Sequence, residues 1–185
     1  GVLFALAQHD LKRLLAYHSV ENIGIILLGL GVGVLGQSTG SPVVAALGYA
    51  GGLLHVVNRA LFRGLLFLAA GAIKSSIHNL QVDELGGLLR RMPRTGVLFL
   101  LGAVAITGLP PLNGFVSEFL VFLGAFHGVG SLGAAGAVAM ALAIGGLSFV
   151  SGLALACFAK AFGVVFLGEP RTAEASHARD PGWLM

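Results

Sequence analysis

Four long apolar stretches, separated by short polar segments, account for most of this 185-residue chain. An α-helix needs about 20 mainly apolar residues to cross the ~30 Å hydrocarbon core of a bilayer, so each stretch is long enough to span it. The pattern therefore predicts an all-α fold, a polytopic transmembrane helix bundle with about four spans. The predicted spans are residues 11–36, 43–77, 95–126 and 132–167, with polar turns at 37–42 and 127–131.

The ends of the chain differ from this apolar middle. Residues 1–9 are expected to form the end of a preceding helix or its loop. Because Gly1 already lies in apolar sequence, we expect the chain to be a piece of a longer protein. Asp10 is a candidate N-cap for the helix that follows it. Residues 168–185 are polar and contain proline, so they are expected to leave the membrane, which places the membrane domain at residues 10–167.

The segment 78–94 is polar but retains a short apolar pattern. Leu85, Leu88 and Leu89 have helical spacing, which is typical of a short amphipathic helix lying on a membrane surface. We therefore predict an amphipathic loop between the second and third spans.

Composition agrees with a membrane protein. The chain is 56% hydrophobic and only 10% charged, against about 25% charged residues in soluble domains. Its 29 glycines include the pairs Gly29–Gly33 and Gly48–Gly52, whose spacing suits close helix packing in membranes. The single cysteine, Cys157, offers neither a disulfide framework nor a metal site.

Basic residues are distributed unevenly between the two sides of the predicted bundle. The turns 37–42 and 127–131 contain no lysine or arginine. By the positive-inside rule, the opposite side, with the 78–94 loop and the C-terminal tail, is expected to face the cytoplasm of a prokaryotic inner (plasma) membrane. The net charge of +3 thus gives no indication of nucleic-acid binding. The basic residues on that side are Lys12, Arg13, Arg90, Arg91, Arg94, Arg171 and Arg179.

The third span cannot be a continuous helix. Its middle contains two consecutive prolines, which remove backbone donors and clash with the preceding turn. Each half has only ~15 residues, or roughly 22 Å, too short to cross alone. Asn113 is a candidate cap for the second half, which carries Glu118 near its start. A carboxylate beside a broken membrane helix is a candidate ion or proton site. The predicted helix break comprises Gly108, Pro110, Pro111, Asn113 and Gly114.

The second span carries a line of basic groups. His55, Arg59 and Arg63 are spaced four residues apart, and Lys74 falls near the same side of the helix. Histidine can accept and donate protons near neutral pH, whereas arginine cannot release its proton. The line is therefore a candidate proton pathway in which the arginines set the field. The alternatives are pairing with carboxylates, a bond from histidine to a carbonyl, or snorkelling of Lys74 to the interface.

Three further ionisable residues fall near or within spans. Glu21 is either a structural partner of a basic residue or part of a conduction path. Lys12 is either an interfacial anchor or a proton entry, and Lys160 either snorkels or faces a polar channel. Motifs for hydrolysis or redox chemistry are absent, and we expect no cofactor or metal on this chain. Haem ligation by His18 and His55 is a remote alternative.

Several motifs in order resemble the antiporter-like membrane subunits of respiratory complex I, membrane-bound hydrogenases and cation/proton antiporters. The sequences of these motifs are most similar to those of the large subunit of formate hydrogenlyase and hydrogenase-4, of the component B type. The motifs are DLKRLLAYHS (10–19), YHSVENIG (17–24), NRALFRGLLFL (58–68), LGGL (85–88), RMP (91–93), GLPPLNGFVSE (108–118) and FAKAFG (158–163).

This resemblance implies about fourteen helices built from two inverted repeats, of which this chain is roughly the tenth to thirteenth, most of the second repeat. It implies that Lys12 links the channel to the cytoplasm and that Glu118 passes protons toward the periplasm. His55 and Arg63 match the family's histidine and lysine facing the second break, and Lys160 lies in the following helix. The family usually has histidine at Arg59 and lysine at Arg63, so the chain lacks two titratable groups there.

Together these observations predict a fragment of a proton-translocating membrane subunit of a hydrogenase-4, formate hydrogenlyase or NADH–quinone oxidoreductase-like complex. Its expected partners are other membrane and soluble subunits, the lipid bilayer, and protons or sodium ions. Redox chemistry would belong to those neighbouring subunits. The alternatives are a subunit of a Na⁺/H⁺ antiporter and a structural membrane anchor without conduction.

Overall fold

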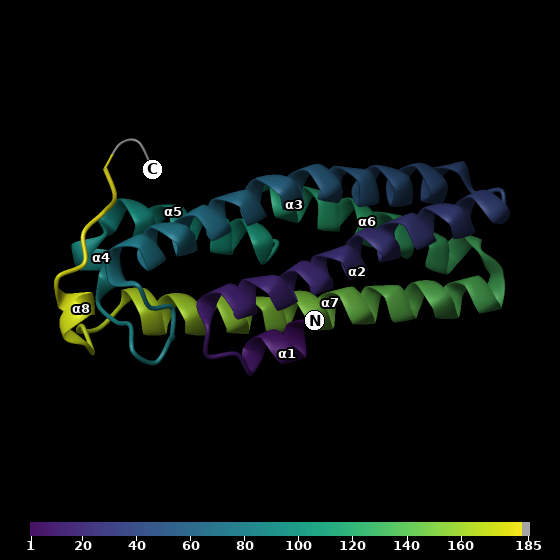
Figure 1. Ribbon diagram of the computed structural model, residues 1–185. Coiled ribbons are helices and arrows are strands. Elements are labelled where there is room, and N and C mark those ends of the chain that lie inside the picture. Colours follow the sequence, from purple (N-terminus) through teal and green to yellow (C-terminus); the bar gives the residue numbers. More distant parts are fainter. Residues whose placement is uncertain (183–185) are drawn as a thin grey trace. The chain divides into compact units, whose positions relative to one another are not determined.

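The computed structural model describes residues 1–182, which are helical apart from short connections (Figure 1). Within the described chain, α2, α3, α6 and α7 are long and apolar enough to cross a membrane, and α5 is a shorter apolar helix. The predicted all-α transmembrane fold with about four spans is confirmed. The helices are α1 (Val2–Leu6), α2 (Leu11–Ser38), α3 (Pro42–Ile77), α4 (Leu88–Arg91), α5 (Pro93–Ile106), α6 (Asn113–Ser131), α7 (Gly133–Phe166) and α8 (Ala173–Ser176).

The starts of α2 and α3 follow from local sequence. Asp10 Oδ1 accepts a hydrogen bond from the backbone N–H of Arg13 over 2.9 Å, so the predicted N-cap of α2 is confirmed. Pro42 is the first residue of α3, a position where its missing N–H leaves no intrahelical bond unmade.

The predicted turn at residues 127–131 is wrong, because α6 continues helically to Ser131. The chain turns instead at Leu132 and Gly133, and Gly133 has a φ of 70°. Gly128 stays in the helix and packs closely on Met140, since a Cβ at Gly128 would lie 2.7 Å from Met140 Cγ. As a result α6 has 19 residues and is itself long enough to span, whereas the 14 residues of α5 are not.

The predicted amphipathic helix before the third span is reduced to the four residues of α4. Gly87, with a φ of 63°, precedes α4 and prevents helix from extending back to Leu85. Leu85 and Leu88 are both fully buried, which excludes a surface helix presenting them to lipid. Gly86 and Gly87 pack against residues 168–171 so closely that a Cβ on either glycine would overlap that backbone.

The chain forms two compact units, and α2, α3, α5 and α7 each contribute to both. Unit 1 contains Gly1–Ser19, Leu61–Val104 and the described chain from Leu153 onward. Unit 2 contains Val20–Ala60 and Ala105–Gly152.

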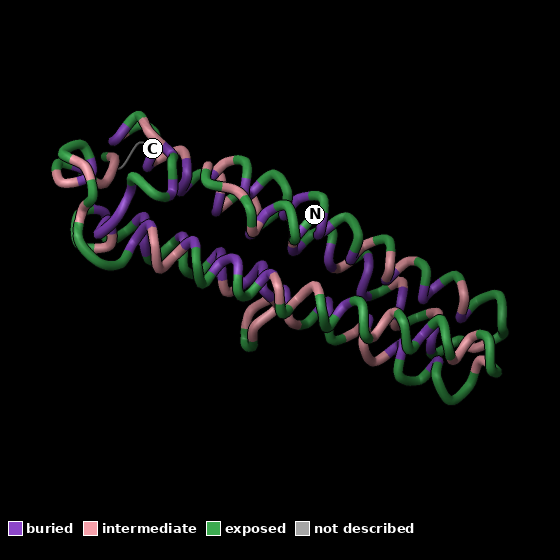
Figure 2. The backbone as a smooth tube through the Cα atoms, turned by 90° about the horizontal axis from the view of Figure 1, so that it is seen from below, coloured by how far each residue is buried: buried purple, intermediate pink, exposed green. Residues whose placement is uncertain are grey.

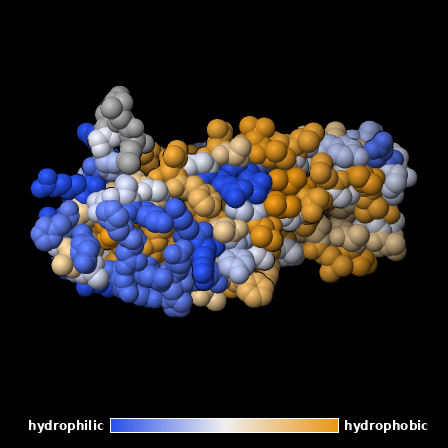
Figure 3. Space-filling view, viewed as in Figure 1, coloured by the Kyte–Doolittle hydropathy of each residue, from blue (hydrophilic) through white to orange (hydrophobic). Residues whose placement is uncertain are grey.

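Unit 1 has an aromatic core and a polar end. The ring of Phe99 lies 5.0 Å from that of Phe166 and 6.5 Å from that of Phe158, and all three are buried. Hydrophilic residues gather on the visible face over α4, α8 and the loop preceding α4 (Figure 3). The C-terminal segment binds to the start of α5. The Asp180 carboxylate accepts hydrogen bonds from the backbone N–H groups of Arg94 and Thr95 over 3.0 and 3.1 Å, and so caps α5.

Unit 2 has an aliphatic core and a close glycine crossing. A Cβ at Gly48 would lie 2.3 Å from the backbone nitrogen of Gly33, and one at Gly29 would lie 2.9 Å from Gly52 Cα. The glycine spacing in the sequence therefore corresponds to contact between the backbones of α2 and α3. Buried and exposed positions alternate along the long helices (Figure 2). The core consists of Ile25, Val32, Val44, Val121, Ala125, Met140 and Leu147.

Candidate functional site

The helix break lies between Ile106, the last residue of α5, and Asn113, the first of α6. Gly108 has a φ of 65°, and the Pro110–Pro111 peptide bond is cis. The two helix ends meet tightly, because a Cβ at Gly114 would lie only 1.9 Å from the carbonyl oxygen of Ala105. The discontinuous helix predicted from the tandem prolines is thus present in the structure.

One detail of the prediction is wrong, since Asn113 does not cap α6. Leu112 occupies the N-cap position, without a side-chain capping bond. The Asn113 side chain instead donates to Asn58 Oδ1 over 3.2 Å, and the Asn113 carbonyl accepts from Asn58 Nδ2 over 2.7 Å. Asn113 is already the first helical residue of α6, and this paired contact directs its side-chain amide toward α3.

Glu118 is buried beside the break, with only 5% of its surface exposed. Its Oε2 accepts a hydrogen bond from Ser151 Oγ of α7 over 2.9 Å. The carboxyl group also lies against Gly108, where a Cβ would approach Oε2 to 2.7 Å. The left-handed glycine of the break therefore provides the space in which this carboxyl group sits.

His55 lies on α3, fully buried between polar groups of α2 and α6. Its Nδ1 is 2.9 Å from Ser117 Oγ, and its Nε2 is 3.0 Å from Asn22 Oδ1. Asn58, one turn further along α3, donates to Ser117 Oγ over 3.1 Å. Unit 2 thus contains a continuous hydrogen-bonded group of polar side chains that ends one residue from Glu118.

The predicted basic line on α3 runs from the buried His55 to an exposed lysine. Arg59 and Arg63 are half-buried, and Lys74 is exposed. The guanidinium carbon of Arg63 lies 5.3 Å from the centre of the Phe67 ring, a cation–π contact. His55 joins this line to the polar network through its contact with Ser117.

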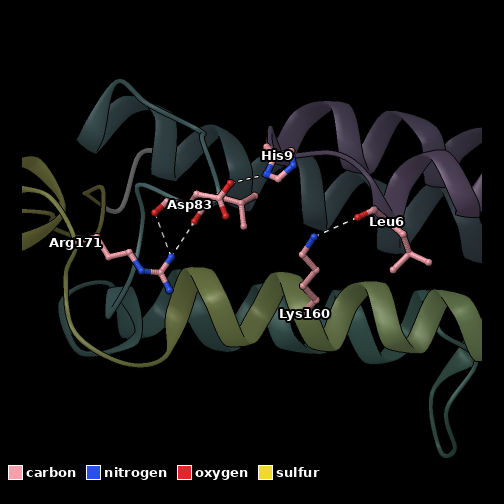
Figure 4. Close-up of polar contacts among 6 residues, drawn as sticks. Leu6, His9, Asp83, Lys160 and Arg171 are labelled. Carbon is pink, nitrogen blue, oxygen red and sulfur yellow. Dashed lines mark hydrogen bonds and ion pairs between the residues drawn. The ribbon is translucent and has the colours of Figure 1, made fainter.

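The remaining candidate residues lie on other helices. On α2, Glu21 is buried and Lys12 is half-buried. On α7, the exposed Lys160 donates from Nζ to the carbonyl of Leu6 over 3.2 Å (Figure 4). The Lys160 ammonium group therefore contacts the C-terminal end of α1, where a cation is favourable.

Figure 4 also shows a polar group at the loop preceding α4. His9 Nδ1 lies 2.5 Å from the carboxylate of Asp83, and both side chains are largely exposed. The guanidinium of Arg171 donates to the backbone carbonyls of Val82 and Asp83 over 3.4 and 3.3 Å. These contacts hold the loop to the C-terminal segment.

Sequence reasoning missed the uncharged members of the site. Asn22 and Ser117 contact His55, Ser151 donates to Glu118, and Asn58 donates to Ser117. Two of them carried a signal, because an asparagine inside an apolar span costs free energy unless it is bonded. Over residues 1–182, no three His, Cys, Asp or Glu side chains are grouped so as to hold a metal ion.

Comparison with known proteins places this geometry in context. Residues 1–145 match the family model described as NADH:quinone oxidoreductase/Mrp antiporter, TM. The chain is 46% identical to hydrogenase-4 component B of Escherichia coli K12 over 97% of its own length and 27% of that protein. It is 44% identical to formate hydrogenlyase subunit 3 of the same organism, over 100% of this chain and 30% of the relative.

A solved structure has the same fold. The chain superimposes on the Mrp complex from Dietzia sp. DQ12-45-1b with a TM-score of 0.73 and 30% sequence identity, covering 91% of this chain and 28% of that one. The chain therefore spans less than a third of the length of each of these proteins.

Proposed function

The chain belongs to the NADH:quinone oxidoreductase/Mrp antiporter transmembrane family, and from this premise we propose that it is part of a proton-translocating membrane subunit. The parent protein would work within a redox-driven complex of the hydrogenase-4, formate hydrogenlyase or NADH–quinone oxidoreductase type. Its partners would be the other membrane and soluble subunits of that complex. Two of its relatives are themselves named as a hydrogenase-4 component and a formate hydrogenlyase subunit.

The observation that carries the proposal is the position of Glu118. This carboxyl group is buried against Gly108 at a broken membrane helix and is hydrogen-bonded to the neutral hydroxyl of Ser151. An ionisable group at membrane depth is costly and usually marks an ion or proton path. In our mechanism Glu118 takes up and releases a proton as charges in the neighbouring subunits change, with the break providing the polar access.

The other candidate residues take supporting roles in this proposal. His55 exchanges protons within the polar group of unit 2, and Arg59 and Arg63 set the field without relaying protons. Lys12 would link the path to the cytoplasm. Glu21 on α2, Lys74 on α3 and Lys160 on α7 would complete the polar path as charged groups.

We also propose an orientation in the membrane. The parent protein would lie in a prokaryotic inner membrane, with the 78–94 loop and the C-terminal tail in the cytoplasm. The support is the seven lysines and arginines assigned to that side of the predicted spans and the absence of any from residues 37–42 and 127–131 at the opposite side.

The proposal is tested on the parent complex in inside-out membrane vesicles by comparing Glu118→Gln with Glu174→Gln, a change on the exposed surface of α8. Glu118→Gln keeps the shape and can still accept from Ser151, but it cannot exchange a proton. Substrate-driven proton translocation should fall to background in Glu118→Gln and stay unchanged in Glu174→Gln, with both complexes assembled. Translocation at the wild-type rate in Glu118→Gln would instead support a structural anchor.

A Na⁺/H⁺ antiporter subunit is the second candidate, and the structural similarity to an Mrp complex favours it. The same vesicles separate the two candidates. Proton exchange driven by a sodium gradient, without any redox substrate, would support the antiporter. Translocation that requires the redox substrate and is indifferent to sodium would support the pump.

A further inference from the structure

Ser117 is at the centre of the buried polar group in unit 2. Its hydroxyl oxygen is 2.9 Å from His55 Nδ1, 3.1 Å from Asn58 Nδ2 and 2.9 Å from the carbonyl oxygen of Gly114. Ser117 and His55 are fully buried, and Asn58 is 4% exposed. A hydroxyl group has one proton to donate, so the three contacts cannot all be bonds that it donates.

The role of Asn58 is determined by its second contact. Its Nδ2 lies 2.7 Å from the carbonyl oxygen of Asn113, which can only accept, and its Oδ1 accepts from Asn113 Nδ2. This pairing orients the amide, and Asn58 Nδ2 therefore donates its other hydrogen to Ser117. One lone pair of the Ser117 oxygen is thus permanently occupied.

The single proton of Ser117 then has two places to go. It can point to His55 Nδ1, which must then be unprotonated, or to the Gly114 carbonyl. In the second arrangement the contact between His55 Nδ1 and Ser117 is a bond only if Nδ1 carries a proton and donates it. The two arrangements need no movement of heavy atoms and differ by one proton on His55.

The opposite side of the ring is the same in both arrangements. His55 Nε2 donates to Asn22 Oδ1 over 3.0 Å whether the ring is neutral or charged. This bond fixes the ring plane and keeps a proton on Nε2. Proton exchange is therefore confined to Nδ1, the nitrogen that contacts Ser117.

We propose that Ser117 is a proton-relay residue that couples the charge of His55 to the first turn of α6. A proton from a protonated water cluster at the break adds to the Ser117 oxygen, while the hydroxyl proton of Ser117 moves to His55 Nδ1. One O–H bond of the water cluster breaks, one N–H bond forms, and the ring gains a single positive charge. The new hydroxyl hydrogen is left pointing at Gly114. The relay resets by the reverse step, in which Nδ1 returns its proton to the Ser117 oxygen and the hydrogen that faced Gly114 passes back to the water cluster.

The coupling to the break follows from helix geometry. In an α-helix the carbonyl of Gly114 accepts from the N–H four residues later, which belongs to Glu118. When the Ser117 hydroxyl points to the Gly114 carbonyl, it shares that acceptor with the backbone N–H of Glu118. When it points to His55, it does not. This relay rests on the proposed proton-translocating function and adds to it the residue that loads His55.

The test compares two variants of nearly the same shape in the parent complex in vesicles. Both variants add a methyl group at Cβ. Ser117→Thr keeps the hydroxyl, whereas Ser117→Val has a second methyl group in its place. We expect Thr to translocate protons within about twofold of wild type and Val to lose about tenfold or more, toward the ~10²-fold typical of a lost proton-transfer group. The solvent deuterium isotope effect on translocation should rise in Val alone, because proton transfer to His55 then limits the rate.

Two controls separate the possible failures. Ser148→Ala removes a hydroxyl whose bond within residues 1–182 goes to the Ile144 carbonyl of its own helix, and it should leave the rate unchanged. If Glu118→Gln abolishes translocation but Thr and Val are equal in rate and isotope effect, the relay is wrong and the proposed function stands. If Glu118→Gln translocates normally, the proposed function itself fails, whatever the Ser117 variants do.

Discussion

The two compact units use polar side chains in opposite ways. In unit 1 the polar contacts involve charged groups near the surface: the side chains of Arg90 and Glu169 pair over 3.0 Å with 78% of each exposed. In unit 2 the contacts next to the break lie inside the spans and involve hydroxyl, amide and imidazole groups: Ser117 and His55 are fully buried, and Asn58 almost so. Exposed ion pairs contribute little free energy, whereas a buried polar group left without a partner costs ~1–3 kcal/mol.

The two kinds of polar contact therefore have different roles: those of unit 1 hold loops in place, and those of unit 2 constrain the site. The charged contacts of unit 1 fasten the C-terminal segment to the loop before α4 and to the start of α5. The hydroxyl and amide groups of unit 2 orient His55 and lie next to the break. We therefore expect substitutions in unit 2 to have larger effects than substitutions of exposed charges in unit 1.

The largest effect is expected where α6 meets α5. Gly114→Ala would place a Cβ 1.9 Å from the Ala105 carbonyl oxygen, so the helix ends must move apart. We expect a loss of about 3 kcal/mol or more, at the upper end of overpacking, measured as thermal unfolding in detergent. The control is Gly130→Ala on the same helix, where nothing lies within 4 Å. Equal stability of the two variants would contradict the tight junction.

An intermediate effect is expected at the cap of α5. Asp180→Ala removes an acceptor for the N–H groups of Arg94 and Thr95 and for the Thr95 hydroxyl, so unit 1 should lose about 0.5–2 kcal/mol. Asp180→Asn keeps an acceptor oxygen and should recover most of this loss in the same unfolding assay. If Asp180→Ala unfolds like the wild type, the C-terminal segment does not stabilise α5.

The smallest effect is expected for the exposed pair. Arg90→Gln breaks the contact with Glu169, and the stability should change by no more than about 1 kcal/mol. Raising the salt concentration should reduce even that difference, since exposed charges are screened. A loss as large as that of Gly114→Ala, which lies in unit 2, would reverse the comparison drawn between the two units.

Local sequence was sufficient to predict the features that depend on a few adjacent residues. Pro110 and Pro111 predicted the break because their effect on a helix is steric and local. Asp10 predicted the start of α2 for the same kind of reason, and the glycine spacing in α2 and α3 indicated their close contact.

Contacts between distant segments could not be predicted in this way. Asn113 has the residue type of a cap, but it is the first helical residue of α6 and its side chain donates to Asn58 on another helix. The hydroxyl of Ser151 faces Glu118 only because α7 packs beside α6 within unit 2. Likewise, the turn expected at 127–131 is helical, and within it the buried Gly128 packs on Met140, a contact with another helix.

The central claim is that the buried carboxyl group of Glu118 changes its protonation state as the parent complex works. Infrared difference spectra between the resting and the turning-over complex measure this directly through the carboxyl C=O stretch. The account predicts a carboxyl band that disappears in Glu118→Gln and persists in Glu174→Gln. An unchanged difference spectrum in Glu118→Gln would contradict it.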